Sequence, residues 1–371
     1  MRWLATLLVF LAVIGTTLGD DAQAAKDATI VETLLRLKTV DVNSNAKLKD
    51  AVLRHLELHK GTPKYVDLIE GLNVREVEEE LLQLALADPA STAGVHAGEL
   101  LLKRDQAALI SAKIFGDDEE VAIKAVSLLG YVGSKEAMEV LKPLAIDNQR
   151  TRPLRTAVAN ALGRSRLGER YLLRVVQDGQ LPADLNFTVA NVLFASTDEA
   201  IRTEVAKHLT LPATAGSKPL PPVAELAKRA GDPVRGQELF RTTATCIKCH
   251  KVRGEGKEVG PDLSEIGSKL PKEAMFISIL DPSAGISHNY ETYTAVLDSG
   301  NVVSGLKVNE TDDSVTIRSA ESIDKVISKS EIEELVKSTV SLMPADLQKT
   351  MSEQDLVDVV EFISTLKKPG A

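Results

Sequence analysis

Apolar residues recur every three or four positions from about residue 28 to residue 210, with polar residues between them. This spacing places apolar side chains on one face of a helix. The pattern also repeats. Gly130 and Gly163 lie 33 residues apart, each follows a leucine, and each precedes a short turn and a second apolar helix. A looser copy begins near Leu185, and an earlier one covers residues 93–115.

Helix pairs with a period of about 30 residues are typical of HEAT-type repeats, in which each pair buries its apolar face against its neighbours. The composition fits this reading, because 44% of the residues are hydrophobic and only 4% are aromatic. We therefore predict a mainly α protein with an N-terminal α-solenoid of HEAT-like repeats over residues 28–210. An irregular helical bundle is the alternative.

The amino-acid composition of the chain changes after the repeats. Residues 210–226 carry four prolines and a Gly-Ser pair, a composition typical of a semi-rigid connection. We predict a Pro-rich linker over 211–230 and a second domain over 231–371. This domain is expected to open with a helix that has Asp232 as its N-cap and Pro233 in its first turn.

Within the second domain, residues 290–328 switch to short runs rich in β-branched residues, separated by turn-forming segments. This pattern predicts a small antiparallel β insertion of about four strands. Two helices are expected after it, because Ser330 with Glu333 and Ser352 with Asp355 each fit an N-terminal capping pattern.

The N-terminus has the character of a targeting segment. Arg2 precedes a short apolar run, Trp3 to Ile14, followed by small residues. The run is shorter than the roughly 20 residues that span a bilayer, so we predict a signal peptide over 1–24, with an uncleaved anchor as the alternative. The expected location is periplasmic or otherwise extracytoplasmic, soluble or peripherally membrane-associated, with no integral membrane segment after cleavage.

The chain has two cysteines, and both lie in Cys246-Ile247-Lys248-Cys249-His250. This C-x-x-C-H spacing is that of c-type haem attachment, in which two thiols one helical turn apart bond the haem vinyl groups and the histidine ligates iron. A disulfide would close too short a loop to stabilise the fold. A thioredoxin-like pair would need a βαβ context, and a zinc site would need further ligands.

The segment 231–371 resembles a monohaem class I cytochrome c domain, of the heme-binding type abundant in planctomycetes and verrucomicrobia. The motifs that carry the resemblance are "RGQELF", Cys246/Cys249/His250, "GPDLSEIG", "ILDPSAGISHNYETY", "SLMP" and the terminal helix. The resemblance implies that Met343 is the second axial ligand, that the Pro261 carbonyl accepts a hydrogen bond from His250, and that Leu263 packs on the ring.

The resemblance also implies that the first and last helices cross where Gly236 and Phe240 meet Phe362, a position at which the family often has tyrosine. From residue chemistry alone, Met343 could instead be a core gap-filler. His288 is the runner-up ligand.

The expected function is one-electron transfer through a single covalently attached haem c, whose iron is ligated by His250 and Met343. The protein is expected to be an electron carrier with no catalytic residues, and its partners to be redox proteins, a dehydrogenase among the candidates. The net charge of −9 argues against nucleic acid. The alternatives are an open sixth iron position, as in a peroxidase or gas sensor, and a scaffold coupling a dehydrogenase to electron transport.

Overall fold

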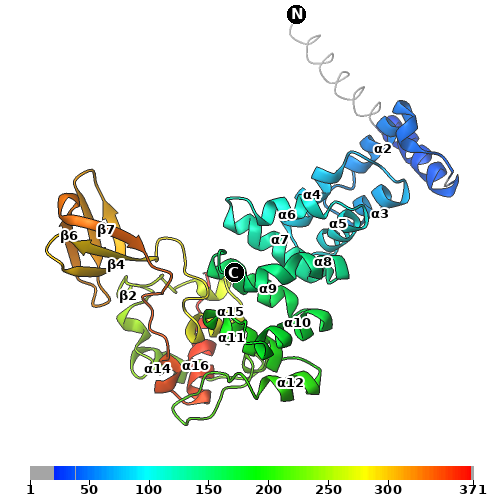
Figure 1. The fold of residues 1–371 in the computed structure, drawn as a ribbon. Helices are drawn as coiled ribbons and strands as arrows, with labels where there is room; N and C mark the ends of the chain where they lie inside the picture. The colour runs from blue at the N-terminus through cyan, green and yellow to red at the C-terminus, as the bar shows by residue number, and fades with distance from the viewer. Residues whose placement is uncertain (1–20, 38, 369–371) are drawn as a thin grey trace, which may run out of the picture. The chain divides into compact units, whose positions relative to one another are not determined.

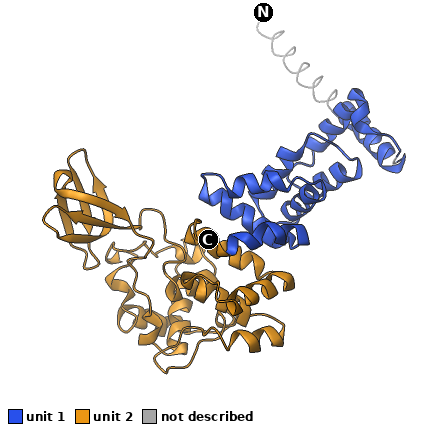
Figure 2. Ribbon diagram, viewed as in Figure 1, with its two compact units in different colours: residues 1–145 blue, residues 146–371 orange. Residues whose placement is uncertain are grey.

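The structure is a computed structural model that describes residues 21–37 and 39–368 (Figure 1). The chain divides into two compact units, residues 1–145 and 146–371 (Figure 2). Most of the predicted signal peptide lies outside the described residues. Among the residues that the structure does describe, no helix has the length and apolar character needed to cross a membrane.

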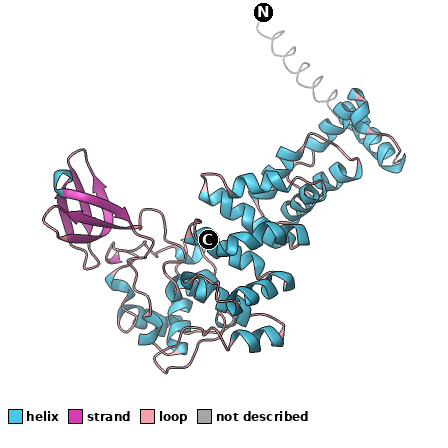
Figure 3. Ribbon diagram, viewed as in Figure 1, coloured by secondary structure: helices cyan, strands magenta, loops and turns pink. Residues whose placement is uncertain are grey.

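The first unit is helical (Figure 3). After a helical stretch at residues 21–37, its helices are α2 (Ala46–Glu57), α3 (Pro63–Gly71), α4 (Glu78–Ala87), α5 (Thr92–Lys103), α6 (Ala107–Ile114), α7 (Glu119–Val132) and α8 (Lys135–Leu141). Side-chain caps define several of the starts. Ser91, Asp118 and Ser134 accept hydrogen bonds from the first-turn backbone of α5, α7 and α8, which satisfies donors that a helix start leaves free.

The second unit begins with four more helices, α9 (Arg152–Leu162), α10 (Arg166–Gln177), α11 (Asn186–Phe194) and α12 (Glu199–Val205). The four predicted sequence copies therefore coincide with the pairs α5–α6, α7–α8, α9–α10 and α11–α12. Gly163 ends α9, and a Cβ there would overlap the side chain of Val192. The glycine thus permits α9 and α11 to approach closely. The helix pairs are confirmed, whereas their stacking as a solenoid stays a prediction.

The segment 211–230, expected as a linker, is packed into the second unit. Leu220, Val223 and Leu226 are buried in the same apolar cluster as Phe240. The short helix α13 (Val223–Leu226) begins where the Val223 amide donates to Asn191 Oδ1 at 2.8 Å. The segment is therefore not a free linker, because the apolar residues between its prolines pack into the core of the second unit. The segment therefore joins α11 to the C-terminal helices.

The C-terminal helices are α14 (Pro233–Arg241), α15 (Lys272–Leu280) and α16 (Glu353–Ser364). Asp232 caps α14 and Ser352 forms a capping box with Asp355 at α16, as predicted. The rings of Phe240 and Phe362 meet edge to face, with centroids 5.5 Å apart. A Cβ on Gly236 would overlap the backbone of Asp358. The predicted crossing of the first and last helices of this domain is present.

A buried carboxylate fixes this crossing. Asp358 of α16 is 1% exposed and accepts hydrogen bonds from the Asp232 amide at 2.9 Å, Arg235 Nη1 at 2.7 Å and Gln354 Nε2 at 2.8 Å. A buried charge is tolerated only when it is paired and hydrogen-bonded. The geometry at Asp358 therefore holds the start of α14 against α16.

Substitution of Gly236 by alanine is expected to lower the thermal stability of the second unit. The added methyl group meets backbone that has no freedom to move away, and overpacking of this kind costs about 1–3 kcal/mol. We expect the melting temperature to fall by roughly 5–10 °C, measured by circular dichroism. Val234→Ala is the control in the same helix, since Val234 is 76% exposed. An equal melting temperature for Gly236→Ala and the unsubstituted protein would contradict the tight crossing.

The β insertion is a five-stranded antiparallel sheet in the order β6-β5-β4-β3-β7. Its strands are β3 (Thr292–Leu297), β4 (Val302–Glu310), β5 (Ser314–Arg318), β6 (Asp324–Ser328) and β7 (Ile332–Lys337). Ala295, Leu297, Val315, Ile317 and Ile327 form its own small core. A separate two-stranded ladder joins β1 (Lys251–Val252) and β2 (Glu255–Gly256).

Two expectations for this region were wrong. The sheet extends to Lys337 and has a fifth strand, and the segment after Ser330 is strand β7 instead of a helix. The capping pattern marks only one 3-10 turn, Lys329–Glu331. Strand β7 pairs with β3 and satisfies backbone hydrogen-bonding groups at the edge of β3. The free energy gained from this pairing outweighs the weak local preference of the segment for a helix.

Candidate functional site

The two cysteines lie on a single tight turn that follows α14. Thr245 adopts a left-handed backbone with φ 53°, and Cys246–Lys248 form a 3-10 turn. The amides of Cys249 and His250 both donate to the Cys246 carbonyl, at 3.1 and 2.9 Å. This turn brings both thiols and the imidazole to the wall of one pocket.

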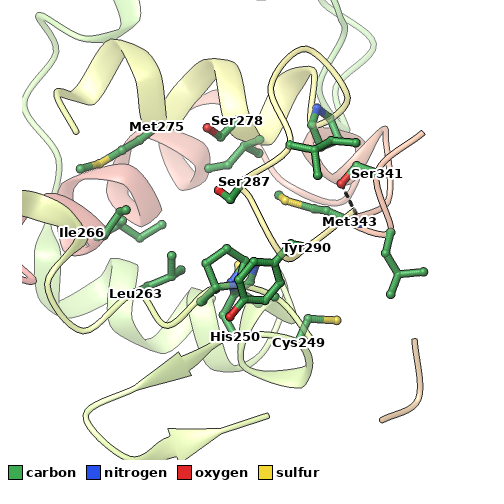
Figure 4. A pocket seen from close by; sticks show the side chains of 18 of the residues that line it. Cys249, His250, Leu263, Ile266, Met275, Ser278, Ser287, Tyr290, Ser341 and Met343 are labelled. Atoms are coloured by element: carbon green, nitrogen blue, oxygen red, sulfur yellow. Dashed lines mark hydrogen bonds between the residues drawn. The ribbon is translucent and has the colours of Figure 1, made fainter. Parts of the chain in front are cut away.

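The pocket has an empty volume of about 1070 Å³, including its opening to solvent (Figure 4). Its wall comes from the cysteine turn, the segment 259–263, α15, the loop 282–290, residues 341–343 and α16. Most of the lining side chains are apolar, among them Phe240, Leu263, Ile266, Met275, Ile279 and Ile363. Hydroxyl groups come from Ser278, Ser287, Tyr290 and Ser341. The site suits a large, largely apolar ligand.

His250 is oriented by the backbone of Pro261. Its Nδ1 lies 2.8 Å from the Pro261 carbonyl oxygen, so Nδ1–H donates and the lone pair of Nε2 is left free. Burial lowers the pKa of His250, and the carbonyl only partly opposes this effect. The neutral imidazole is the form that ligates a metal, and such a hydrogen bond fixes its tautomer and ring orientation.

Gly260 is a site residue that sequence reasoning missed. A Cβ there would lie 2.5 Å from Cε1 and 3.0 Å from Nε2 of His250. The imidazole therefore occupies the space of the missing side chain. Gly256 has a similar role at φ 104°, where a Cβ would overlap the His250 carbonyl. The sequence holds no signal for this apart from the glycine beside Pro261.

Gly260→Ala is expected to rotate the His250 ring out of place and to lower the yield of haem-bearing protein severalfold. The added Cβ lies well inside the normal contact distance to three ring atoms. The yield is measured from the ratio of Soret to protein absorbance after maturation. Gly216→Ala is the control, since nothing lies within 4 Å of its Cβ position and its φ, like that of Gly260, is not positive. Equal haem yields for Gly260→Ala and the unsubstituted protein would contradict this role.

Both thiols are free in the structure. Burial raises the pKa of Cys246 to about 12 and also raises that of Cys249. They are therefore neutral thiols near pH 7. Within the described part of the chain, no group of three or more His, Cys, Asp or Glu side chains is arranged to hold a metal ion.

Met343 also lies in the pocket wall, on a loop that is hydrogen-bonded to serine hydroxyl groups. Its amide donates to Ser341 Oγ at 3.2 Å, and its side chain extends into the space near Ser287 (Figure 4). Met275 of α15 also lines this pocket and is 4% exposed. His288, the runner-up ligand, has a side chain 87% exposed and does not belong to the pocket wall.

The β insertion lies next to the cysteine turn. A second hollow there is lined by Cys246, Cys249, Lys248, Met343 and the β5–β6 turn residues Ala320 and Glu321, among others. Two long side chains tie the turn to the motif. Lys257 Nζ donates to the Glu321 carbonyl and Arg318 Nη1 to the Glu258 carbonyl, each at 3.1 Å. The insertion is therefore adjacent to the candidate site.

The donor set fits a haem. Two thiols one turn apart, a neutral histidine with a free Nε2, and a methionine thioether line one apolar pocket. These are the groups that attach and axially ligate haem c. A partly buried imidazole whose Nδ1 is held by a backbone carbonyl, with Nε2 facing no hydrogen-bond partner, is the arrangement expected of a metal ligand.

Comparison with known proteins decides the assignment. Residues 233–316 match the family model of cytochrome c. This part of the chain is a cytochrome c domain. The domain implies covalently bound haem c with iron and haem-based electron transfer. The match includes Cys246, Cys249 and His250 and ends within β5, before Met343. No curated protein matched the chain.

Proposed function

We propose that the protein is an exported one-electron carrier with a single haem c, bonded to Cys246 and Cys249 and ligated by His250 and Met343. The observation that supports this proposal most strongly is the shared pocket. His250, Met343 and both thiols line one apolar space although Met343 lies far along the chain from the cysteine motif. The cytochrome c match supports the redox chemistry.

The chain's own residues tune that chemistry. The Pro261 carbonyl holds the His250 ring, and Leu263 packs beside it in the pocket wall. A thioether ligand favours ferrous iron and raises the reduction potential, and an apolar surround disfavours the additional charge of the ferric state. When bound, haem supplies the exchange between Fe(III) and Fe(II).

Export and partner choice belong to the same proposal. Cytochrome c domains are usually extracytoplasmic, which agrees with the apolar run that follows Arg2. We propose that the helical repeats serve as a docking scaffold for a redox partner, with a dehydrogenase among the candidates. The residue pattern of the repeats alone supports this part.

The visible spectrum and redox titration of the haem-loaded protein test the carrier function. We expect a low-spin ferric haem with the far-red methionine-to-iron charge-transfer band and a single one-electron wave. A high-spin haem that binds cyanide or CO at once would overturn the carrier proposal. That result would favour the open sixth position of a peroxidase or gas sensor.

A further inference from the structure

The loop that carries Met343 is connected by hydrogen bonds to helix α9 of the repeat-like region. We propose that Arg152, Asp281, Ser283 and Ser341 act together as positioning residues that hold Met343 in the pocket wall. This inference rests on the proposed function, because it concerns the methionine proposed there as the second axial ligand.

The first contact joins α9 to the loop that follows α15. Arg152 Nη2 lies 2.6 and 2.7 Å from the two carboxylate oxygens of Asp281. Both side chains are largely buried, at 14% and 10% exposure. The same guanidinium donates to the Asp184 carbonyl at 2.8 and 3.1 Å, so its direction is fixed. Charge-assisted hydrogen bonds with such restricted partners are among the stronger side-chain contacts.

The second contact joins that loop to the methionine segment. The Ala284 amide donates to the Asp281 carbonyl at 3.0 Å, which closes a turn over Pro282 and Ser283. Ser283 Oγ accepts from the Ser341 amide at 3.0 Å, and Ser341 Oγ accepts from the Met343 amide at 3.2 Å. The chain of contacts from α9 therefore ends on the backbone of Met343.

The loop between these contacts is itself part of the site. Pro282, Gly285, Ser287 and Tyr290 all line the pocket. Burial would favour protonation of Asp281, and Arg152 is the group that opposes this effect. Loss of Arg152 would leave a buried carboxylate without its partner, which strongly destabilises a local structure. The turn at Ser283 would then move, and its hydrogen bond to Ser341 would be lost.

A helix of the repeat-like region therefore contributes to holding an iron ligand. The segment 231–371 does not contain this contact by itself, since Arg152 precedes it. The expected consequence is that the methionine is exchanged for added ligands more readily when the Arg152–Asp281 pair is broken, while the histidine side is unchanged.

The test uses full-length, haem-loaded protein with Arg152→Gln, Asp281→Asn or Ser283→Ala. The control is Arg155→Gln, because Arg155 lies one turn further along α9 and pairs with Asp184 without contacting Asp281. Imidazole titration of the ferric protein, followed by loss of the far-red band, measures how easily Met343 is displaced. We expect about tenfold tighter imidazole binding in Arg152→Gln and Asp281→Asn, which lose a charged hydrogen bond, and about fivefold tighter binding in Ser283→Ala, which loses a neutral one. The change in Arg155→Gln should be no more than about twofold.

The outcomes separate the two proposals. Unchanged imidazole affinity in Ser283→Ala and Arg152→Gln, with the far-red band present, overturns the positioning network and leaves methionine ligation intact. An equal gain in imidazole affinity in Arg155→Gln also overturns the network, because general loosening of α9 would then be the cause. If the unsubstituted protein lacks the far-red band, both the proposed methionine ligation and the positioning network are wrong. Should Arg152→Gln not fold, Ser283→Ala decides the matter.

Discussion

Replacement of both Cys246 and Cys249 by alanine is expected to yield a protein without covalently bound haem. Each thiol would form one thioether bond, so the double variant has no atom to which the cofactor can be bonded, and the chain holds no other cysteine. Intact mass spectrometry of this double variant, expressed with the haem-maturation machinery, should give the mass of the polypeptide alone. The single variants should keep one bond and give a lower yield of haem-bearing protein.

The mass measurement has a matched control in Lys248→Ala. Lys248 lies between the two cysteines and is exposed, so its loss changes the motif without removing an attachment atom. This variant should keep the mass of one haem. An unsubstituted protein whose mass lacks a haem would remove the basis of the whole functional proposal, including the ligand assignments.

Met343→Ala is expected to abolish the far-red charge-transfer band and to lower the reduction potential. Loss of the thioether would remove the proposed soft ligand, which stabilises ferrous iron. The fall should be on the order of 100 mV or more, since axial ligands shift haem potentials over about 0.8 V. The two quantities are measured by ferric absorption spectra and potentiometric titration.

Met275 provides the comparison for this experiment. Met275→Leu keeps the volume of a buried side chain that also lines the pocket, and a volume-conserving change of this kind usually costs little. The band and the potential should therefore be nearly unchanged. The reverse result, with the band lost only in Met275→Leu, would assign the ligand to α15 in place of the 341–343 loop.

Local signals predicted much of this protein. The caps at Asp232 and Ser352 mark real helix starts, because a capping side chain and the amides it satisfies lie within one turn of each other. The C-x-x-C-H spacing likewise describes chemistry contained in a single turn. Where sequence neighbours are also the physical partners, a pattern of residues is sufficient.

The features that escaped prediction depend on residues distant in the chain. Strand β7 forms because β3 offers an edge to it. The role of Gly260 depends on where the His250 ring lies, and the presence of Met275 in the pocket wall depends on the packing of α15. The pattern of apolar and polar residues cannot predict these positions, because each depends on tertiary contacts with another segment of the chain.

The buried Asp358 has a consequence for the order in which the protein matures. Synthesis proceeds from the N-terminus, so the cysteine motif is made well before α16 and its carboxylate. Until that last helix arrives, the amide of Asp232 and the guanidinium of Arg235 lack their acceptor, and the pocket lacks Ile363 from its wall. Docking of α16 is therefore the step that completes the pocket wall around both thiols.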